Sequence, residues 1–156
     1  MAKDTQSIKC IILTLRNQNV IVPDALVAEI ISVKEIEEGT GKPGWYLGDM
    51  KWRGISVPLM SFEAAGGMKH AKVNLNTQAA ILYAVTRDGE EVKHPYIGLV
   101  MSGVPHISNF SREQFKFDSD VAEDHPMIAQ NVRINGASVS ILDVDCMMNM
   151  VDELAA

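Results

Sequence analysis

The sequence predicts a mainly β protein built as barrels or as a sandwich. Three observations support this fold class. Short apolar runs rich in β-branched residues are separated by Gly, Pro, Asn and Asp. No long helical pattern lies between these runs, which disfavours a doubly wound sheet. One pattern of turn, strand and helix start occurs twice in the chain.

The N-terminal region predicts a hairpin. Residues 8–16 and 20–22 are β-rich runs, and an Asn-Gln-Asn turn separates them. Pro23 stops the second run, and Asp24 is a plausible N-cap for a single helical turn. We expect the chain to return to an extended segment around residues 30–33.

Residues 45–60 predict a strand, a turn and a second strand, after a polar, Gly-rich loop over residues 35–44. Pro58 lacks a backbone N–H, so we expect the second strand to lie at a sheet edge or to contain a bulge. Ser61 is positioned to cap a short helix that the glycines at 66–67 end.

The second half of the chain repeats this organisation. Residues 79–85 and 96–101 predict strands, and Arg87-Asp88-Gly89 lies between them as a turn. Residues 106–124 are polar and predict a long connection that three phenylalanines fasten to the core.

The clearest hairpin signal is the Asn135-Gly136 pair, which suits a two-residue type I′ turn. It predicts strands over residues 127–134 and 137–142. Asp143 is then positioned to cap an amphipathic helix, because Val144, Met147, Met148 and Val151 follow at helical spacing.

Residues 53–62 and 135–144 show the internal repeat most clearly. Gly, Ser and Val coincide between the two segments, and each predicts a turn, a strand, a cap and a helix start in that order. We interpret the repeat as two related β halves.

Composition excludes several functional classes. With 156 residues, 47% of them hydrophobic, the chain is long enough for one domain with a real core. A net charge of −6 disfavours a nucleic-acid or anionic-membrane surface. The N-terminal apolar run is too short to span a bilayer. Cys10 and Cys146 predict no disulfide framework, which fits a reducing, cytoplasmic setting.

The sequence shows no recognisable catalytic or metal site. Residues 39–43 resemble a phosphate loop, but Ile36 stands where Gly is required and Pro43 where Ser or Thr is required. Cys10 lies in an apolar run and is interpreted as a buried hydrophobe. No histidine lies three or four residues from another or from a cysteine, so surface or loop positions are expected for His70, His94, His106 and His125.

One segment carries a specific resemblance. Residues 45–59, WYLGDMKWRGISVPL, combine an aromatic-Leu-Gly opening, an Arg-Gly turn and a hydrophobic-Pro-hydrophobic strand. In this order they resemble the CheW family of chemotaxis coupling proteins. Three further segments fit in sequence, so that the resemblance covers residues 8–151: Val22-Pro23 with residues 27–30, residues 96–100, and residues 138–143.

The resemblance implies two packed Src-homology-3-like five-stranded β-barrels with short helices and a C-terminal amphipathic helix. It implies one domain over residues 7–154, with barrel halves at 7–70 and 71–143 and the helix at 144–154. The implied function is that of a non-catalytic adaptor, without cofactor or metal, which couples the tips of methyl-accepting chemoreceptors to a CheA-type histidine kinase. Such a protein is cytoplasmic, associates peripherally with receptor arrays, and neither binds nucleic acid nor inserts into the membrane.

The resemblance also implies partner-binding residues. Glu29 and Arg53 correspond to acidic and basic residues that face each other beside the receptor-binding groove. Trp52 is interpreted either as a core residue or as an exposed aromatic at the kinase-facing edge. Leu99 and Met101 are expected to alternate with Val100 between core and groove.

The chain also departs from the family pattern. Lys51-Trp52 replaces the common Asn-Leu before Arg-Gly, while Ser61 and Ser102 stand where Asp is common. These changes leave the fold prediction intact and leave two options for the partners: the protein serves a specialised pathway, such as one for surface or pilus motility, or it has kept one partner surface and lost the other. Two alternative functions remain: a small-ligand sensor using the cleft between the barrels near Leu99 and Met101, and a hydrolase or transferase with a dispersed site.

Overall fold

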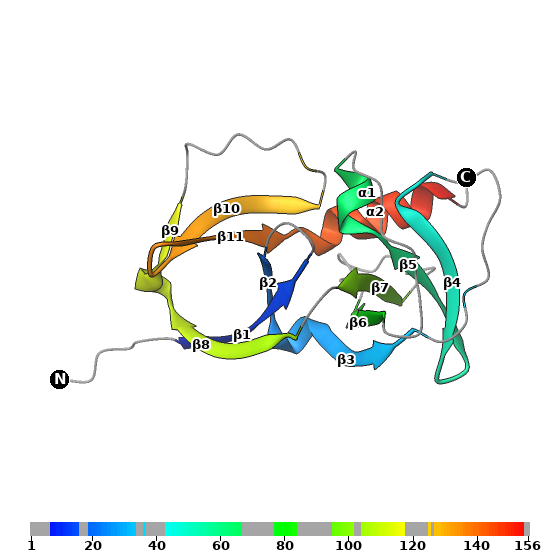
Figure 1. Cartoon of the computed structure of the whole chain (residues 1–156), viewed down its shortest axis with the longest axis horizontal. Helices are drawn as coiled ribbons and strands as arrows, with labels where there is room; N and C mark the ends of the chain where they lie inside the picture. The colour runs from blue at the N-terminus through cyan, green and yellow to red at the C-terminus, as the bar shows by residue number, and fades with distance from the viewer. Residues whose placement is uncertain are drawn as a thin grey trace, which may run out of the picture.

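The computed structural model describes residues 7–15, 19–33, 36, 43–66, 77–83, 95–101, 104–117, 125 and 127–154. Within these ranges the chain forms two sheets that lie side by side along the long axis (Figure 1). The six-stranded sheet has the order β8-β1-β2-β11-β10-β9, with β1 Ser7–Thr14, β2 Asn19–Pro23, β8 His106–Ser111, β9 Phe115–Phe117, β10 Ile128–Ile134 and β11 Ala137–Leu142. The five-stranded sheet has the order β3-β6-β7-β5-β4, with β3 Val27–Ser32, β4 Tyr46–Trp52, β5 Ile55–Met60, β6 Gln78–Tyr83 and β7 Tyr96–Met101.

The helices are short except at the C-terminal end. They are the 3₁₀ turns η1 Asp24–Leu26 and η2 Arg112–Gln114, the single turn α1 Phe62–Ala65, and α2 Val144–Leu154. The mainly β class predicted from the sequence is confirmed, and so are both N-terminal strands, the 46–60 hairpin, the Asn-Gly hairpin and the amphipathic helix.

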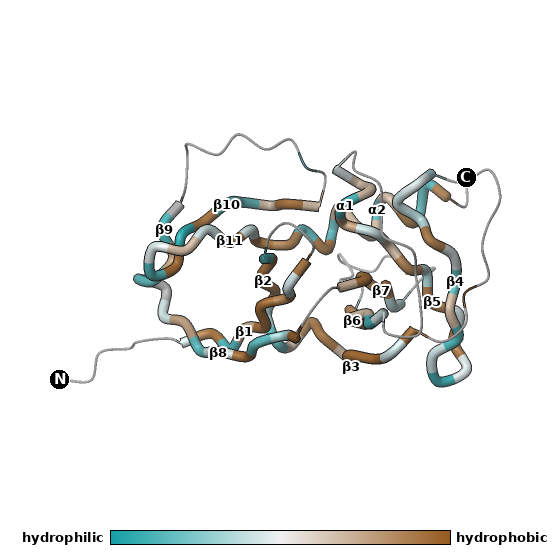
Figure 2. The backbone as a smooth tube through the Cα atoms, viewed as in Figure 1, coloured by the Kyte–Doolittle hydropathy of each residue, from teal (hydrophilic) through white to brown (hydrophobic). Residues whose placement is uncertain are grey.

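The two sheets do not divide the chain at residue 70, so the expected barrel halves 7–70 and 71–143 are wrong as a description of strand content. The N-terminal hairpin β1–β2 belongs to the sheet of the C-terminal strands. β1 pairs antiparallel with β8, and β2 pairs parallel with β11. The hairpin is largely hydrophobic (Figure 2) and buries both faces, so it fits between other strands rather than at a solvent-exposed edge.

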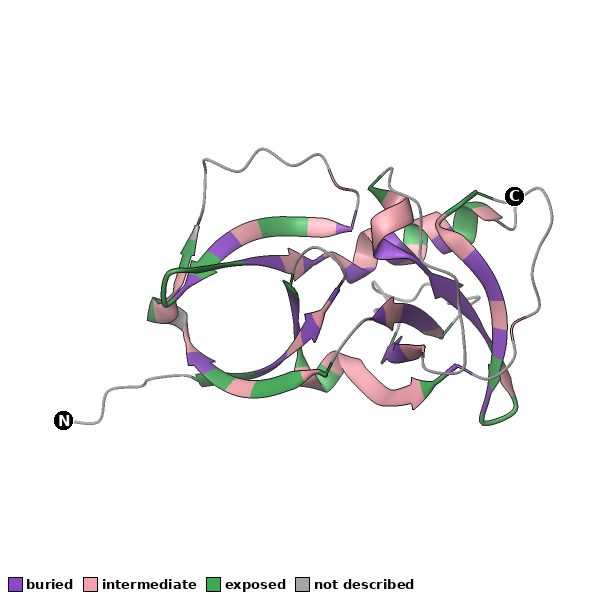
Figure 3. Ribbon diagram, viewed as in Figure 1, coloured by how far each residue is buried: buried purple, intermediate pink, exposed green. Residues whose placement is uncertain are grey.

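The described part of residues 106–124, predicted as an irregular connection, contains the strands β8 and β9. β8 pairs with β1 and lies at one end of its sheet. Most of its residues are exposed or half-buried, so its sequence lacks the apolar pattern that predicts a strand. Figure 3 shows exposed positions along β8, whereas β6 is exposed only at its last residue, Tyr83, and β7 has no exposed residue. Phe110 and Phe115 meet edge to face at 5.8 Å between ring centroids, as a fastening role predicts. The turn η2 separates β8 from β9, and this sheet therefore has six strands rather than five.

Pro58 does not mark an edge strand. β5 lies between β4 and β7, and β4 occupies the edge position. The ladder between β5 and β7 joins Leu59 to Gly98 and Met60 to Leu99, so it begins one residue after the proline. The register shift lies in β4, between Tyr46 and Gly48.

Two of the three predicted helix caps are present. Ser61 Oγ accepts a hydrogen bond from the Ala64 N–H at 3.1 Å, and Asp143 Oδ1 accepts one from the Cys146 N–H at 3.0 Å. The third expectation is wrong: Asp24 is the first residue of η1, and Pro23 occupies the cap position without a side-chain bond.

The two segments of the internal sequence repeat also have the same backbone structure. Arg53 and Gly54 have φ of 49° and 76°, and Asn135 and Gly136 have φ of 51° and 86°. Two successive positive φ values define a type I′ hairpin turn in both places. Each turn is followed by a strand with a parallel neighbour, β7 for β5 and β2 for β11, and then by a capped helix.

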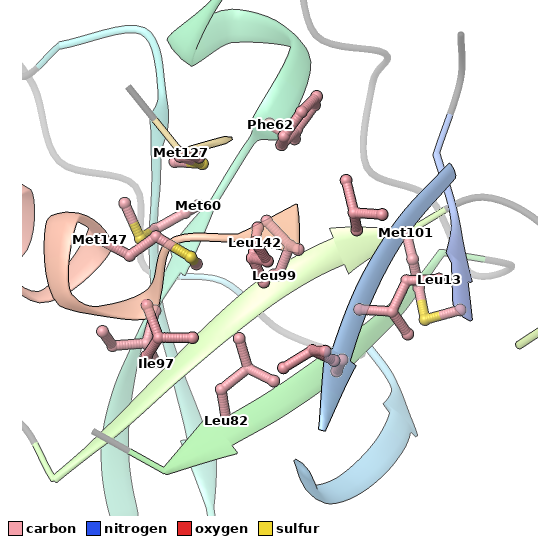
Figure 4. Close-up of a cluster of buried hydrophobic side chains, with 14 of the residues drawn as sticks. Leu13, Met60, Phe62, Leu82, Ile97, Leu99, Met101, Met127, Leu142 and Met147 are labelled. Carbon is pink, nitrogen blue, oxygen red and sulfur yellow. The ribbon is translucent and has the colours of Figure 1, made fainter. Parts of the chain in front are cut away.

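The largest apolar cluster lies between the two sheets, and we call it the junction core (Figure 4). β1 and β2 contribute side chains from one sheet, β6 and β7 from the other, and α2 adds Val144, Met147 and Val151. Two smaller clusters each belong to a single sheet. Because β6 and β7 alternate between the junction core and the cluster of their own sheet, both of their faces are buried.

His125 lies outside the helices and strands, in keeping with the expected surface or loop position, but its half-buried ring has a structural role. Its ring stacks on Phe62 at 3.9 Å between centroids and also leaves no room for a side chain at Gly66. Nδ1 accepts a hydrogen bond from the Met127 N–H at 3.0 Å, so in the neutral ring Nε2 carries the proton and donates to the Phe62 carbonyl at 2.7 Å. The histidine thereby fastens the start of β10 to α1.

A substitution at Gly98 tests the packing between β5 and β7. A Cβ added there would fall on Leu59 Cδ2, and Leu59 is fully buried. We expect Gly98→Ala to lower the free energy of unfolding by about 1–3 kcal/mol, because an overpacked core must displace its neighbours. Urea denaturation under reducing conditions measures the change. Gly44→Ala is the matched control, since nothing lies within 4 Å of its added Cβ; equal stability of the two variants would contradict the prediction.

Candidate partner-binding site

Glu29 and Arg53 form an ion pair on the surface of the five-stranded sheet. A guanidinium nitrogen of Arg53 donates to Glu29 Oε1 at 2.9 Å. The side chains are 69% exposed for Arg53 and 40% for Glu29. The structure therefore brings together, across 24 residues of sequence, the two residues that the resemblance paired. Both charges remain accessible to a partner.

The position of the pair follows from the sheet order. Glu29 lies on β3, at one end of the five-stranded sheet, and Arg53 lies in the turn that follows β4, at the other end. Figure 1 shows this turn at the tip of the β4–β5 hairpin, on the same side of the molecule as β3. The ion pair thus joins the two ends of the sheet where no backbone ladder does.

The Trp52 ring packs against the guanidinium group of Arg53. The Arg53 guanidinium carbon lies 4.8 Å from the centroid of the Trp52 ring, within the range of a cation–π contact. The indole meets Tyr96 edge to face at 4.8 Å, and Tyr96 in turn contacts Tyr83. Trp52 is only 7% exposed, so the core interpretation of this residue holds. Its buried Nε1–H finds no acceptor among the described residues.

Leu99 and Met101 do not line an open groove. Both point into the junction core (Figure 4), with exposed fractions of 0% and 4%. Val100 points to the opposite face of β7, where it packs against the cluster of the five-stranded sheet. The expectation that these residues alternate between core and groove is therefore corrected: both faces of β7 are core. Of the five residues expected to bind partners, Glu29 and Arg53 offer accessible charge.

The described residues show no chemical site beside this surface. No group of three or more His, Cys, Asp or Glu in that part of the chain could hold a metal ion. Burial, and secondarily the charge of Asp24, raises the pKa of the Cys10 thiol. Burial, followed by Asp143 and Glu153, does the same to the pKa of Cys146. Both thiols are therefore poor nucleophiles at neutral pH.

Among the described residues, no helix is long and apolar enough to cross a membrane.

Comparison with known families shows which family the chain belongs to. The family model described as the CheW-like domain matches residues 9–152. The chain belongs to the CheW-like domain family. The matched range contains both strands of the candidate site, both sheets, and nearly all of α2.

A solved structure supports the same fold. It is the crystal structure of scaffolding protein TtCheW from Thermoanaerobacter tengcongensis, with a TM-score of 0.70 and 13% sequence identity. The match covers 88% of this chain and 90% of that one. At this identity the similarity shows the fold, which is a pair of packed Src-homology-3-like barrels. A comparison with curated proteins finds no match.

The Glu29–Arg53 pair of this CheW-like domain should contribute little to stability. For side chains as exposed as these, pairing contributes roughly 0–1 kcal/mol. A double-mutant cycle with Glu29→Gln and Arg53→Gln, followed by urea denaturation, should give a coupling energy within that range that shrinks as salt is added. A coupling energy well above that range would instead make the pair a structural clasp of the sheet.

Proposed function

We propose that this CheW-like domain is an adaptor that couples the cytoplasmic tips of chemoreceptors to a CheA-type histidine kinase in a signalling pathway controlling motility. The family match across residues 9–152 is the observation that carries the proposal. The protein acts by binding both partners at once and performs no reaction itself. It works in the cytoplasm, as a single unit spanning residues 7–154, beside receptor arrays at the inner membrane.

The junction core supports an adaptor role. A coupler must hold two partners at a fixed separation and angle. A continuous apolar core between the sheets resists their relative rotation, because interiors at this density do not deform smoothly. Each sheet also keeps its own smaller core. Each sheet therefore keeps its own packing when a partner binds to the other.

We assign the receptor contact to the surface around Glu29 and Arg53. Both charges are accessible, and Arg53 is held in place by the carboxylate and by the Trp52 ring. A guanidinium fixed in this way loses little side-chain entropy when a partner binds. Arginine is also common among residues that dominate binding energy at protein interfaces. Trp52 then acts by positioning Arg53 rather than by touching the partner.

The alternative of a ligand sensor at Leu99 and Met101 has no support at that place, since both side chains are packed in the junction core. A dispersed catalytic site has none either among the described residues, where the titratable groups around Glu29 and Arg53 form a plain ion pair.

A pulldown from the native cell lysate tests the proposal. Wild-type bait should recover chemoreceptors and a CheA-type kinase. Arg53→Glu should lose the receptors, because it places two carboxylates where an ion pair was, while the kinase is retained.

Lys51→Glu is the matched control, since it makes the same charge change at an exposed position on the same hairpin. This variant should recover both partners. If wild-type bait recovers neither a kinase nor receptors, the adaptor function is rejected. If Lys51→Glu loses the receptors as completely as Arg53→Glu does, net charge rather than this site governs binding.

A further inference from the structure

A pocket of about 520 Å³ opens in the six-stranded sheet, on the other sheet from the Glu29–Arg53 pair. The strand β9 at one end of that sheet and the four strands in its middle contribute to the wall of the pocket. The side chains that matter most are Ile8 and Cys10 of β1, Ile21 of β2, Phe115 of β9, Val132 of β10 and Ile141 of β11. Most of them also belong to the apolar cluster of this sheet. The pocket is therefore a hollow in a small hydrophobic core.

The size of the pocket suits a small molecule. Binding sites for such ligands commonly measure roughly 300–1,000 Å³. An apolar cavity of about 150 Å³ in a protein core is enough to hold benzene. The pocket thus has room for a molecule of two or three rings, or for an aliphatic chain of similar bulk.

The wall excludes a charged ligand. None of the described residues that line the pocket carries a charge. The Cys10 thiol already donates a weak hydrogen bond to the Ile8 carbonyl, at 3.6 Å. A buried charge without a partner is strongly disfavoured. The molecule that fits is uncharged and is held by burial of its apolar surface.

The wall also disfavours a peptide. A peptide brings backbone N–H and C=O groups that need partners wherever water is excluded. The backbones of β1, β2, β10 and β11 are already paired with one another in ladders. Pro23, which also lines the pocket, has no N–H to offer. A compact molecule without a polar backbone leaves no such group unpaired.

We propose that this pocket is a binding site for a small, uncharged, apolar molecule. Ile21 faces the occupant from β2, while its neighbour Val20 faces the junction core. The occupant therefore contacts the strand that joins the two sheets. This site is separate from the proposed partner surface and does not depend on the adaptor function.

Fluorescence titration of the purified chain with N-phenyl-1-naphthylamine, a neutral probe with three aromatic rings, tests the proposal. We expect saturable binding with one probe per chain. Ile8→Asp should weaken binding by about ten-fold or more, because it places a short carboxylate at the mouth of the pocket. Ile8 is 46% exposed, so the substitution is compatible with folding, which circular dichroism checks.

Ile107→Asp is the matched control. Ile107 is 59% exposed on β8, and its ladder partner is Ile11, whereas the partner of Ile8 is Phe110. The odd offset places the two isoleucines on opposite faces of the β1–β8 pair. Ile107→Asp should bind the probe as the wild type does. Equal weakening by both variants, or no saturable binding by the wild type, would overturn the proposal.

Alkylation of the two cysteines gives a second test on the unmodified protein. Cys10 lines the pocket and Cys146 lies on α2, so mass spectrometry after iodoacetamide treatment at mildly alkaline pH reports both at once. The probe should slow the alkylation of Cys10 several-fold and leave Cys146 unchanged. Unchanged alkylation of Cys10 at saturating probe would overturn the assignment. Protection of Cys10 by a bound protein partner, but not by the probe, would do so as well and would assign the pocket to a macromolecule.

Discussion

The apolar contact between the two sheets determines the rest of the structure. Leu13 and Val20 from one sheet meet Leu82 and Leu99 from the other, and Met147 of α2 closes the cluster. Each of these side chains is fully buried and contributes roughly 1.5–3 kcal/mol by leaving water. An exposed ion pair such as Glu29–Arg53 contributes at most about 1 kcal/mol. Packing therefore fixes how the barrels are oriented, and the surface charges are free to serve recognition.

The two type I′ turns of the internal repeat differ in how well their first residue suits a positive φ. Asn135 and Arg53 occupy the same position of equivalent type I′ turns, and both have positive φ. Asparagine tolerates this backbone conformation well, whereas arginine rarely adopts it. The arginine gains a carboxylate partner in Glu29 and an aromatic face in Trp52. The less favourable residue is thus retained at the one turn whose side chain lies beside an accessible acidic partner.

Local signals in the sequence predict the parts of the fold that depend on neighbouring residues. Asn135-Gly136, Ser61 and Asp143 each act through bonds or backbone angles within a few residues, and each was predicted correctly. The strand β8 was missed because its polar residues are acceptable only at the end of a sheet, beside β1. Sheet membership depends on pairing between segments far apart in the chain, which periodicity does not encode.

The candidate site also depends on contacts between segments that lie far apart in the chain. Glu29 lies on β3 and Arg53 in the turn between β4 and β5, and no spacing rule joins them; only the family resemblance paired them. The burial of Leu99 and Met101 follows from the junction core on one side of β7 and the sheet cluster on the other. A strand buried on both faces has no alternation that could reveal which face a partner would meet.

The interleaving of the strands has a consequence for how the protein folds as it is made. The hairpin β1–β2 leaves the ribosome before the other strands of its sheet, and its neighbours β8 and β11 emerge much later. At a synthesis rate of about 5–20 residues per second, the apolar hairpin waits on the order of ten seconds for β11. The sheet formed by β3–β7, by contrast, is complete in the nascent chain well before then. Chaperones that shield exposed strands should therefore bind the nascent chain at the β1–β2 hairpin until β11 has emerged.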